Sequence, residues 1–467
     1  MLLRCAGKKG YKGDYCMTSP SFGASDMENV LNLPRYTVLS VKEEPHDYHI
    51  DVETVDPPGQ CLECGSDNIV GGGRQEILIK DLPMHGKRVG IYVKARRFRC
   101  RDCGKTITER LPDVADGQRM TNRLHQWICR ESVERTFVSI ANEVGVSEGT
   151  VRGIFNDYIK RMEQDLVFET PIWMGIDEIH IIKKPRCVIS NIENNTVVDM
   201  LTDRSKVIIT NYLMRMPRRQ SVKCVTMDMW RPYKDVVNSV LPNAFIVVDK
   251  FHVLRMAQKA MEDIRKNIRE ALTTKQRRGL LHDRFLMLKR EHELTEFERM
   301  NVEVWTRNFP ALMEAYRAKE RFFSIYDAMD IPEAEGLYSD WLTSLPPQIK
   351  EAFTPLITAM GNWRTEIMAH FDHPVTNAYT ESLNNLIRFT NRCGRGYSFE
   401  ALRAKVLFSA GAHKIIKPRF ERKAPADRMY KQTFAFSMGE PTASTQRTIN
   451  YGVDTSTLLK LAEEGRI

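Results

Sequence analysis

Three apolar runs set the architecture of this chain: Trp173-Met-Gly-Ile-Asp177-Glu-Ile-His-Ile, Val222-Lys-Cys-Val-Thr-Met-Asp228-Met-Trp and Ala244-Phe-Ile-Val-Val-Asp249-Lys-Phe-His252. Runs of about five or six apolar or β-branched residues predict strands buried within a sheet. Each run carries an aspartate where a strand would end or bend, and a buried ionised carboxylate costs free energy unless something compensates it. One such aspartate is usually a cap or a turn residue, but three in one region indicate a cation site.

The residues between these runs predict the order of the secondary structure. Residues 186–192 and 196–201 are apolar runs separated by Glu193-Asn-Asn195, which predicts an antiparallel meander with an Asn-Asn turn. Residues 205–216 have helical spacing, with Ser205 as a candidate N-cap. A second helix is expected between the second and third runs.

The predicted order is three strands, a helix, a strand, a helix and a strand. This is the order of an RNase H-like core. In that fold the first and fourth strands lie side by side, so we expect Asp177 to lie next to Asp228. A third acidic residue normally comes from a later helix. The sequence therefore predicts a mixed-sheet core with a carboxylate cluster.

Composition and charge bound the possible classes of protein. At 467 residues the chain is long enough for about three domains of ~100–200 residues. No run reaches the ~18–20 apolar residues of a membrane span, so we expect no membrane partner. The net charge of +9 is weak evidence for a polyanionic partner, and the clustering of basic residues matters more. Without a secretory signal, the ten cysteines predict metal ligands in a reducing cytoplasm rather than disulfides.

Two Cys-x-x-Cys-Gly motifs predict a metal-binding β domain. Cys61 and Cys64 precede one glycine, and Cys100 and Cys103 precede another. Two thiolates from each motif can bind one zinc ion, and the glycine permits the tight turn. Residues 76–80 and 89–99 between the motifs are expected to be strands, and the second is strongly basic. The alternatives are four unrelated thiols and, for the basic strand, a solvated edge.

Residues 137–155 have the pattern of a helix-turn-helix. Gly145 permits the turn and Ser147 is a candidate cap of the second helix. Four polar residues of that helix would be free to face a DNA major groove, and they are Ser147, Glu148, Thr150 and Arg152. The alternative is a helical hairpin that only packs against other helices.

A later helix supplies the candidate third acid. Asn377, Glu381, Asn384 and Arg388 share one face by helical spacing, and Glu381 is the carboxylate among them. Residues 386–423 are rich in Lys and Arg, which suggests a track for backbone phosphates that includes Arg388, Arg392 and Arg395. About 120 residues of amphipathic helix separate this part from Asp249, and prolines such as Pro355 are expected to punctuate them.

We therefore expect a multidomain α+β and α/β protein. Its predicted segments are a disordered leader (1–26, before a more regular sequence from Met27), a zinc-ribbon β domain (27–112), a helix-turn-helix domain (113–168), the first part of the RNase H-like core (169–254), an α-helical insertion (255–372), the second part of the core with a basic tract (373–424) and a C-terminal tail (425–467).

Together these motifs resemble the bacterial insertion-sequence transposases of the ISL-three family, over residues 27–420. The resemblance implies a DDE transposase, with the triad assigned to Asp177, Asp228 and Glu381. Asp249 and His252 match the Asp-x-x-His element of several DDE families, so they are expected to support catalysis, as are Asn377 and Asn384. The alternative for Asp249 and His252 is a helix cap with a satisfied histidine. The implied partners are the double-stranded DNA of the element ends and of the target, and a homodimer or higher oligomer in the bacterial cytoplasm, associated with the nucleoid.

The chemistry of phosphodiester cleavage explains these residue types. Two Mg²⁺ (or Mn²⁺) ions can stabilise the attacking and leaving oxygens, and three carboxylates suit so hard a cation. We therefore expect two ions at the triad and one structural zinc ion. Other classes remain open: a DNA-binding regulator derived from a transposase and no longer catalytic, and a carboxylate-pair hydrolase acting on sugars, which would lack DNA affinity.

Overall fold

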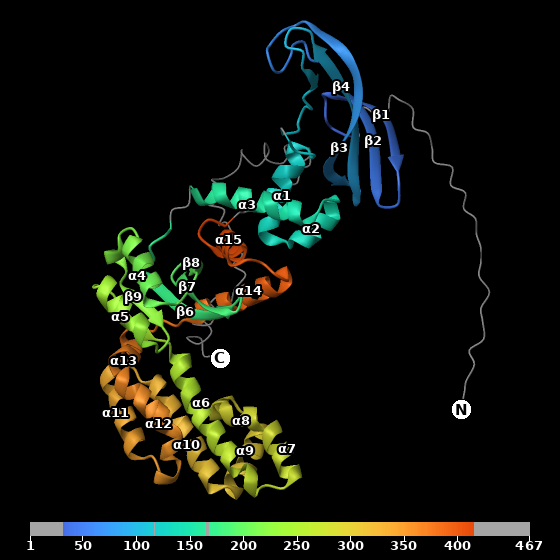
Figure 1. The fold of residues 1–467 in the computed structure, drawn as a ribbon. Coiled ribbons are helices and arrows are strands. Elements are labelled where there is room, and N and C mark those ends of the chain that lie inside the picture. Colours follow the sequence, from blue (N-terminus) through green and yellow to red (C-terminus); the bar gives the residue numbers. More distant parts are fainter. Residues whose placement is uncertain (1–30, 116, 165–167, 415–467) are drawn as a thin grey trace, which may run out of the picture. The chain divides into compact units, whose positions relative to one another are not determined.

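A computed structural model describes residues 31–115, 117–164 and 168–414 of the chain (Figure 1). The expected leader (1–26) and C-terminal tail (425–467) lie outside these residues. Within the described part no helix combines the length and the apolar composition that a membrane-spanning segment needs.

A five-stranded sheet forms the N-terminal part. Its strands are β1 (Tyr36–Glu43), β2 (Asp47–Thr54), β3 (Ile69–Met84), β4 (Lys87–Cys100) and β5 (Thr106–Thr108). They run in the order β1-β2-β4-β3, and β5 pairs with β4. The basic strand β4 therefore lies inside the sheet, and the alternative of a solvated edge strand is wrong. Alternate residues of β4 enter an apolar cluster that includes Val89, Ile91 and Val93.

Three helices follow: α1 (Asn122–Glu134), α2 (Phe137–Val144) and α3 (Glu148–Gln164). Gly145 ends α2 with φ 72°, a left-handed conformation that glycine adopts without steric cost. The Ser147 hydroxyl accepts a hydrogen bond from the Thr150 backbone N–H at 3.1 Å, as expected of an N-cap. The predicted helix-turn-helix is therefore present.

A second five-stranded sheet carries the acidic residues. Its strands are β6 (Trp173–Ile181), β7 (Lys184–Asn191), β8 (Thr196–Leu201), β9 (Cys224–Met227) and β10 (Phe245–Val248). The order is β10-β9-β6-β7-β8. β6, β7 and β8 form the predicted antiparallel meander, and β9 pairs in parallel with both β6 and β10. The first and fourth strands of this mixed sheet are therefore neighbours.

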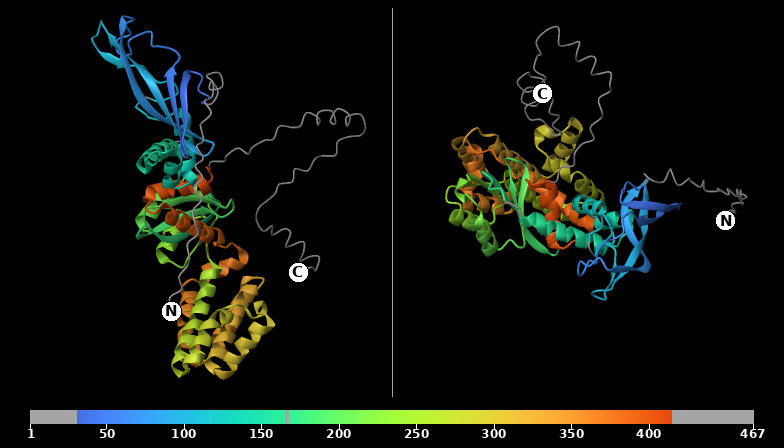
Figure 2. Two further views of the ribbon diagram at one scale, coloured as in Figure 1. Left: turned by 90° about the vertical axis from the view of Figure 1, so that its right-hand side faces the viewer. Right: turned by 90° about the horizontal axis from the view of Figure 1, so that it is seen from above.

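Helices cover both faces of this sheet (Figures 1 and 2). One face packs in an apolar cluster with α4 (Lys206–Arg215), α5 (Arg231–Val240) and α6 (Lys250–Asn267). The other face receives α14 (Ala378–Gly394) and α15 (Phe399–Ala410). Ser205 occupies the N-cap position of α4 as predicted, and its side chain makes no capping hydrogen bond there.

A helical segment connects β10 with α14. It consists of α6, α7 (Thr274–His282), α8 (Arg284–Leu288), α9 (Glu296–Asn308), α10 (Pro310–Ser324), α11 (Ile331–Thr343), α12 (Pro347–Asn362) and α13 (Arg364–Asp372). Pro355 lies inside α12 rather than at a helix end, which corrects the expectation that it punctuates the helices. Because α6 begins directly after β10 and runs into this segment, the helical segment and the sheet share one apolar cluster.

Candidate active site

Strand alternation sends two carboxylates to the face of the sheet that α14 covers. Asp177 lies within β6, and Asp228 directly follows β9. β6 and β9 are parallel, with Ile176 opposite Met227, so the next residue of each strand is an aspartate. Successive side chains of a strand point to opposite faces, and both aspartates therefore share one face. The predicted adjacency of the first and fourth strands brings these two acids together.

Asp177 is held by two hydrogen bonds. The Asn384 Nδ2 of α14 donates to Asp177 Oδ2 at 2.6 Å, and the Glu178 backbone N–H donates to Asp177 Oδ1 at 2.6 Å. Burial raises the pKa of Asp177 above its usual range. Asn384, predicted as a supporting residue, thus orients the carboxylate of the central strand.

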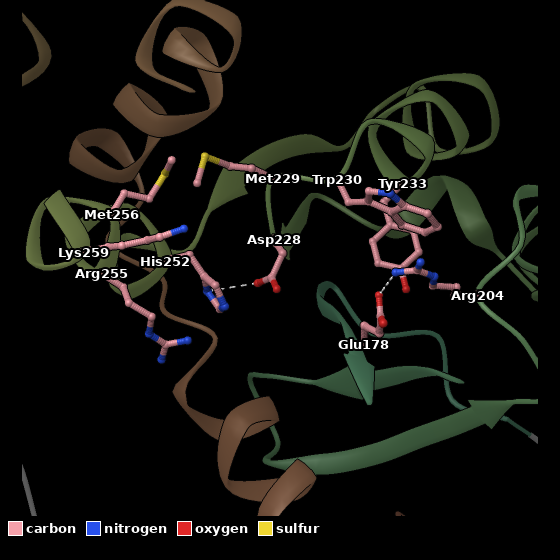
Figure 3. A pocket seen from close by; sticks show the side chains of 10 residues that line it. All are labelled: Glu178, Arg204, Asp228, Met229, Trp230, Tyr233, His252, Arg255, Met256 and Lys259. Atoms are coloured by element: carbon pink, nitrogen blue, oxygen red, sulfur yellow. Dashed lines mark hydrogen bonds and ion pairs between the residues drawn. The ribbon is translucent and has the colours of Figure 1, made fainter. Parts of the chain in front are cut away.

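His252 lies between the other two aspartates. Its Nδ1 is 3.0 Å from Asp228 Oδ1 and 3.4 Å from Asp249 Oδ2 (Figure 3 shows the first contact). Asp249 is fully buried, and its Oδ1 accepts a hydrogen bond from the Phe251 backbone N–H at 3.3 Å, which makes it the N-cap of α6. The Asp249 carboxylate beside the ring raises the pKa of the His252 imidazole.

Glu381 projects from the first turn of α14 and is partly exposed. Its Oε1 is 3.5 Å from Arg255 Nη2 of α6. Candidate ligand atoms of Glu381, Asp249 and His252 lie within 4.8 Å of one another. Sequence reasoning assigned Asp249 and His252 only supporting roles, yet the structure groups their ligand atoms with that of Glu381.

A buried polar contact fixes α14 on the sheet. Ser190 Oγ of β7 lies 2.7 Å from Thr380 Oγ1, and Thr226 of β9 donates to Asn377 Oδ1 at 3.3 Å. Any Cβ at Gly175 of β6 would overlap the polar atoms of Ser190, Thr380 and Asn377. The helix approaches so closely because this position is glycine.

Sequence reasoning named Asn377 and Asn384 but missed Thr226, the partner of Asn377, and the contact of Thr380 with Ser190. Asn377, Thr380 and Asn384 follow one another at helical spacing, which was the available signal for a polar helix face. A buried polar group requires a partner. The strands provide it through Ser190 and Thr226, residues that single-strand patterns do not distinguish from ordinary core positions.

The pKa of Asp228 leads to a prediction about stability. Burial, followed by the charge of Asp177, raises this pKa to about 7. The unfolded value is ~3.9, so the folded state binds more protons between pH ~4 and ~7, and the contribution of Asp228 to stability falls as the pH rises through that window. We expect Asp228→Asn to raise the melting temperature at pH 8 and to change it little at pH 4, in buffer without added divalent cations. Equal effects at both pH values would contradict the assignment.

A pocket of about 420 Å³ opens beside these acids (Figure 3). Asp228 lies between two walls, one formed by His252, Arg255 and Lys259 of α6 and the other by Trp230 and Tyr233. The Arg204 guanidinium lies 4.5 Å from the centre of the Trp230 ring and also forms an ion pair with Glu178. Of these aromatic and basic residues, only His252 was identified from the sequence.

The four cysteines converge as predicted. Cys61 Sγ is 3.8 Å from Cys103 Sγ, and Cys64 Sγ is 3.6 Å from Cys100 Sγ. Each motif closes through the glycine N–H, which donates to the carbonyl of the first cysteine, and both glycines have φ above 70°. A tetrahedral cation with a preference for thiolates fits four such sulfur atoms.

The basic tract proves to have two parts. Arg388, Arg392 and Arg395 are exposed on α14 and at its C-terminal end. Arg403, by contrast, pairs with Asp199 at 2.7 Å, and Lys405 is 1% exposed with its Nζ donating to the Arg135 carbonyl at 2.8 Å. Two cations of the basic tract are therefore used inside the protein, and residues 415–423 of that tract lie outside the described residues.

The side chains of α3 are also partly engaged. Arg152 pairs with Glu148 at 2.5 Å and lies 5.4 Å from the Phe137 ring centre, and the Ser147 and Thr150 hydroxyls are 2.8 Å apart. The four residues lie at the start of the second helix as predicted. Arg152 is therefore not free, and it would have to leave Glu148 in order to contact a base.

Comparison with known proteins supplies the family. Residues 174–406 match a family described as "Transposase", the DDE transposase of ISL3 elements. Residues 109–159 match the "Helix-turn-helix domain of transposase family ISL3", and residues 57–103 match the "zinc-finger of transposase IS204/IS1001/IS1096/IS1165". A similar protein is the "Transposase for insertion sequence element IS1001" of Bordetella parapertussis, 23% identical over 328 residues that cover 68% of this chain and 80% of that protein.

These matches extend over the zinc motif, the helix-turn-helix and the acidic core, in the order in which the chain carries them. A non-catalytic regulator is not favoured, because the core with its carboxylates matches an enzyme family. The chain therefore belongs to the ISL3 family of insertion-sequence transposases, and it is a DNA-binding polynucleotidyl transferase that uses divalent cations.

Proposed function

We propose that Asp177, Asp228 and Glu381 form the catalytic triad of this transposase, on an RNase H-like core. One observation carries the proposal: the parallel pairing of β6 with β9 brings Asp177 and Asp228 to the face on which α14, the helix that bears Glu381, is packed. The strand order β10-β9-β6-β7-β8 also agrees with that fold.

The donor set suits Mg²⁺ or Mn²⁺. Carboxylate oxygens are the ligands that hard cations prefer, and the electrostatics favour a positive charge, because burial and the neighbouring Asp177 raise the pKa of Asp228 to about 7. Two ions are proposed, with Asp177 shared and Asp228 and Glu381 each serving one. Ions bound there would stabilise the attacking and leaving oxygens of the phosphodiester.

The other residues of the site position these acids. Asn384 donates to Asp177 and leaves the second oxygen of that carboxylate to the Glu178 N–H and a cation. Asp228 is proposed as the second acid because its side chain is 31% exposed and lines the pocket, whereas Asp249 is buried and caps α6. His252 contacts both aspartates and would keep Asp228 oriented.

Two reactions follow from this arrangement. In strand cleavage a water oxygen attacks the phosphorus, and the 3′-oxygen leaves as a hydroxyl group. In strand transfer that 3′-hydroxyl attacks a phosphorus of the target DNA, and a target 3′-oxygen leaves. No serine or tyrosine nucleophile is required in either step.

The proposed test uses the full chain and the ends of its insertion sequence. Incubation with Mg²⁺ should yield nicks that map to the element boundaries, and addition of target DNA should yield joined products. Binding to end DNA with no metal-dependent nicking would argue against the catalytic assignment.

Zinc bound by Cys61, Cys64, Cys100 and Cys103 would stabilise the N-terminal sheet. We further propose a homodimer or higher oligomer on DNA in the bacterial cytoplasm, associated with the nucleoid.

DNA recognition by α3 provides a second prediction. If Arg152 contacts a guanine edge, Arg152→Ala is expected to weaken binding to the element ends by ~1–3 kcal/mol and to leave binding to random DNA nearly unchanged. Gel-shift titrations on both DNAs measure this difference. Equal losses on both would indicate a phosphate contact, and no loss on either would mean that α3 faces protein.

The exposed arginines of α14 and its C-terminal end are proposed to bind backbone phosphates. They are Arg388, Arg392 and Arg395.

A further inference from the structure

One face of α6 presents basic side chains to the pocket beside the acids. His252, Arg255 and Lys259 follow one another at helical spacing and line the same wall (Figure 3). The side chain of Arg255 is 64% exposed, and Lys259 forms no ion pair with any residue that the structure describes. Basic side chains left available beside a carboxylate site attract an anionic ligand.

The facing wall has a different chemistry. It is formed by Trp230 and Tyr233, and Arg204 is already engaged there by Glu178 and by the Trp230 ring. Phosphate groups would therefore contact the α6 wall, and the sugar and base of the same nucleotide would contact the aromatic wall. The pocket, about 420 Å³, lies within the ~300–1,000 Å³ range of ligand sites.

Arg255 already has a partner, Glu381, with which a phosphate would compete. Its Nη2 lies 3.5 Å from Glu381 Oε1, a long contact, and both side chains are solvent-exposed. Such exposed ion pairs contribute little to stability. A divalent cation that takes the Glu381 carboxylate would therefore displace the guanidinium and leave it free beside the pocket.

We propose that Arg255 and Lys259 bind phosphates of the DNA strand next to the scissile phosphate, and that Arg255 exchanges Glu381 for a phosphate when a divalent cation binds Glu381. The inference rests on the proposed role of Glu381 as a cation ligand. Arg255 thus neutralises the third carboxylate before the cation arrives and binds the substrate strand afterwards, whereas Lys259 serves the strand alone.

The two variants Arg255→Ala and Lys259→Ala separate these roles. Mn²⁺ binding to DNA-free protein is measured by electron paramagnetic resonance. Arg255→Ala should tighten Mn²⁺ binding roughly 1.5- to 5-fold, because a competitor for Glu381 is removed. Lys259→Ala should leave Mn²⁺ binding unchanged. Lys266→Ala is the matched control on the same helix, since Lys266 is exposed, pairs with Asp263 and lies outside the pocket.

End-DNA binding is then measured as a function of salt, with Ca²⁺ and separately with EDTA. In Ca²⁺ each of the two variants should reduce the slope of log K against log salt by ~0.9, the loss of one phosphate contact. In EDTA only Lys259→Ala should do so, because Arg255 then remains on Glu381. Lys266→Ala should follow the wild type throughout.

Failure of this inference is distinguishable from failure of the proposed function. Wild-type protein that neither binds Mn²⁺ nor cleaves end DNA would remove the catalytic proposal itself. If the wild-type protein binds Mn²⁺ and cleaves end DNA, but Arg255→Ala binds Mn²⁺ equally well or more weakly, the proposed exchange of Glu381 for a phosphate by Arg255 is overturned. Identical behaviour of Arg255→Ala and Lys259→Ala in every assay would do the same. Melting temperatures verify that each variant is folded.

Discussion

Asp177→Asn is expected to reduce DNA strand cleavage by at least ~10³-fold, because a divalent cation contributes several kcal/mol to such a transition state and each ~1.4 kcal/mol is a factor of ten. Asparagine preserves the shape of the side chain but removes the charge that a shared cation needs. Binding to the element ends should change little, since α3 and the exposed arginines of α14 lie outside the carboxylate cluster. Cleavage of labelled end DNA and gel-shift affinity are measured on the same preparation.

Matched variants sharpen this result. Asp235→Asn on α5 replaces an exposed aspartate that pairs with Lys206 at 3.3 Å outside the site, and it should cleave like the wild type. Asp228→Asn and Glu381→Gln should lose cleavage as Asp177→Asn does. Asp249→Asn should chiefly lower the melting temperature, because it weakens the cap of α6. Cleavage that survives in Asp228→Asn but not in folded Asp249→Asn would make Asp249 the second acid of the triad.

Loss of the zinc site is the second large effect. Cys64→Ser removes one of four converging thiolates, and structural zinc contributes ~10–16 kcal/mol of apparent binding free energy in zinc-finger peptides. Bound zinc should fall from one ion per chain to near zero by metal analysis. Two of the cysteines, Cys61 and Cys100, belong to a small apolar cluster with Ile107, separate from the larger cluster of the same sheet. We therefore expect the ends of β3 and β4 to lose order while the rest of the sheet stays folded.

Limited proteolysis measures that difference. New cleavage sites in Cys64→Ser should be confined to the two cysteine motifs and the strand ends between them. Cys393→Ser is the control, because Cys393 is also an exposed free cysteine but lies on α14. Unfolding of the whole N-terminal sheet would mean that zinc holds both clusters together. Zinc-free wild-type protein from a fresh preparation would remove the metal assignment.

The sequence by itself determined the local elements. The apolar runs ending in Asp228 and Asp249 became strands because alternation and β-branching report a buried sheet directly. The Cys-x-x-Cys-Gly motifs and Gly145 predicted turns because few residues other than glycine adopt φ above 70° without strain. These signals operate over a few neighbouring residues, so a single sequence is sufficient to reveal them.

The tertiary structure decided which side chains meet. Asp228 and Asp249 look alike in sequence, yet one lines the pocket and the other is buried as a helix cap. Lys405 lies in the tract whose basic residues suggested phosphate binding, but α15 buries it against the end of α1, and burial lowers its pKa to about 7.

The central polar contact of the site has the same origin. Asn384 donates to Asp177 across 207 residues of sequence, and that bond exists because Gly175 lets α14 approach the sheet and because Ser190 and Thr226 receive its polar face. Periodicity predicts that a face is polar or apolar, but only packing determines its partner. The pairing of distant groups depends on the summed burial and hydrogen bonding of whole elements, and no local pattern contains that information.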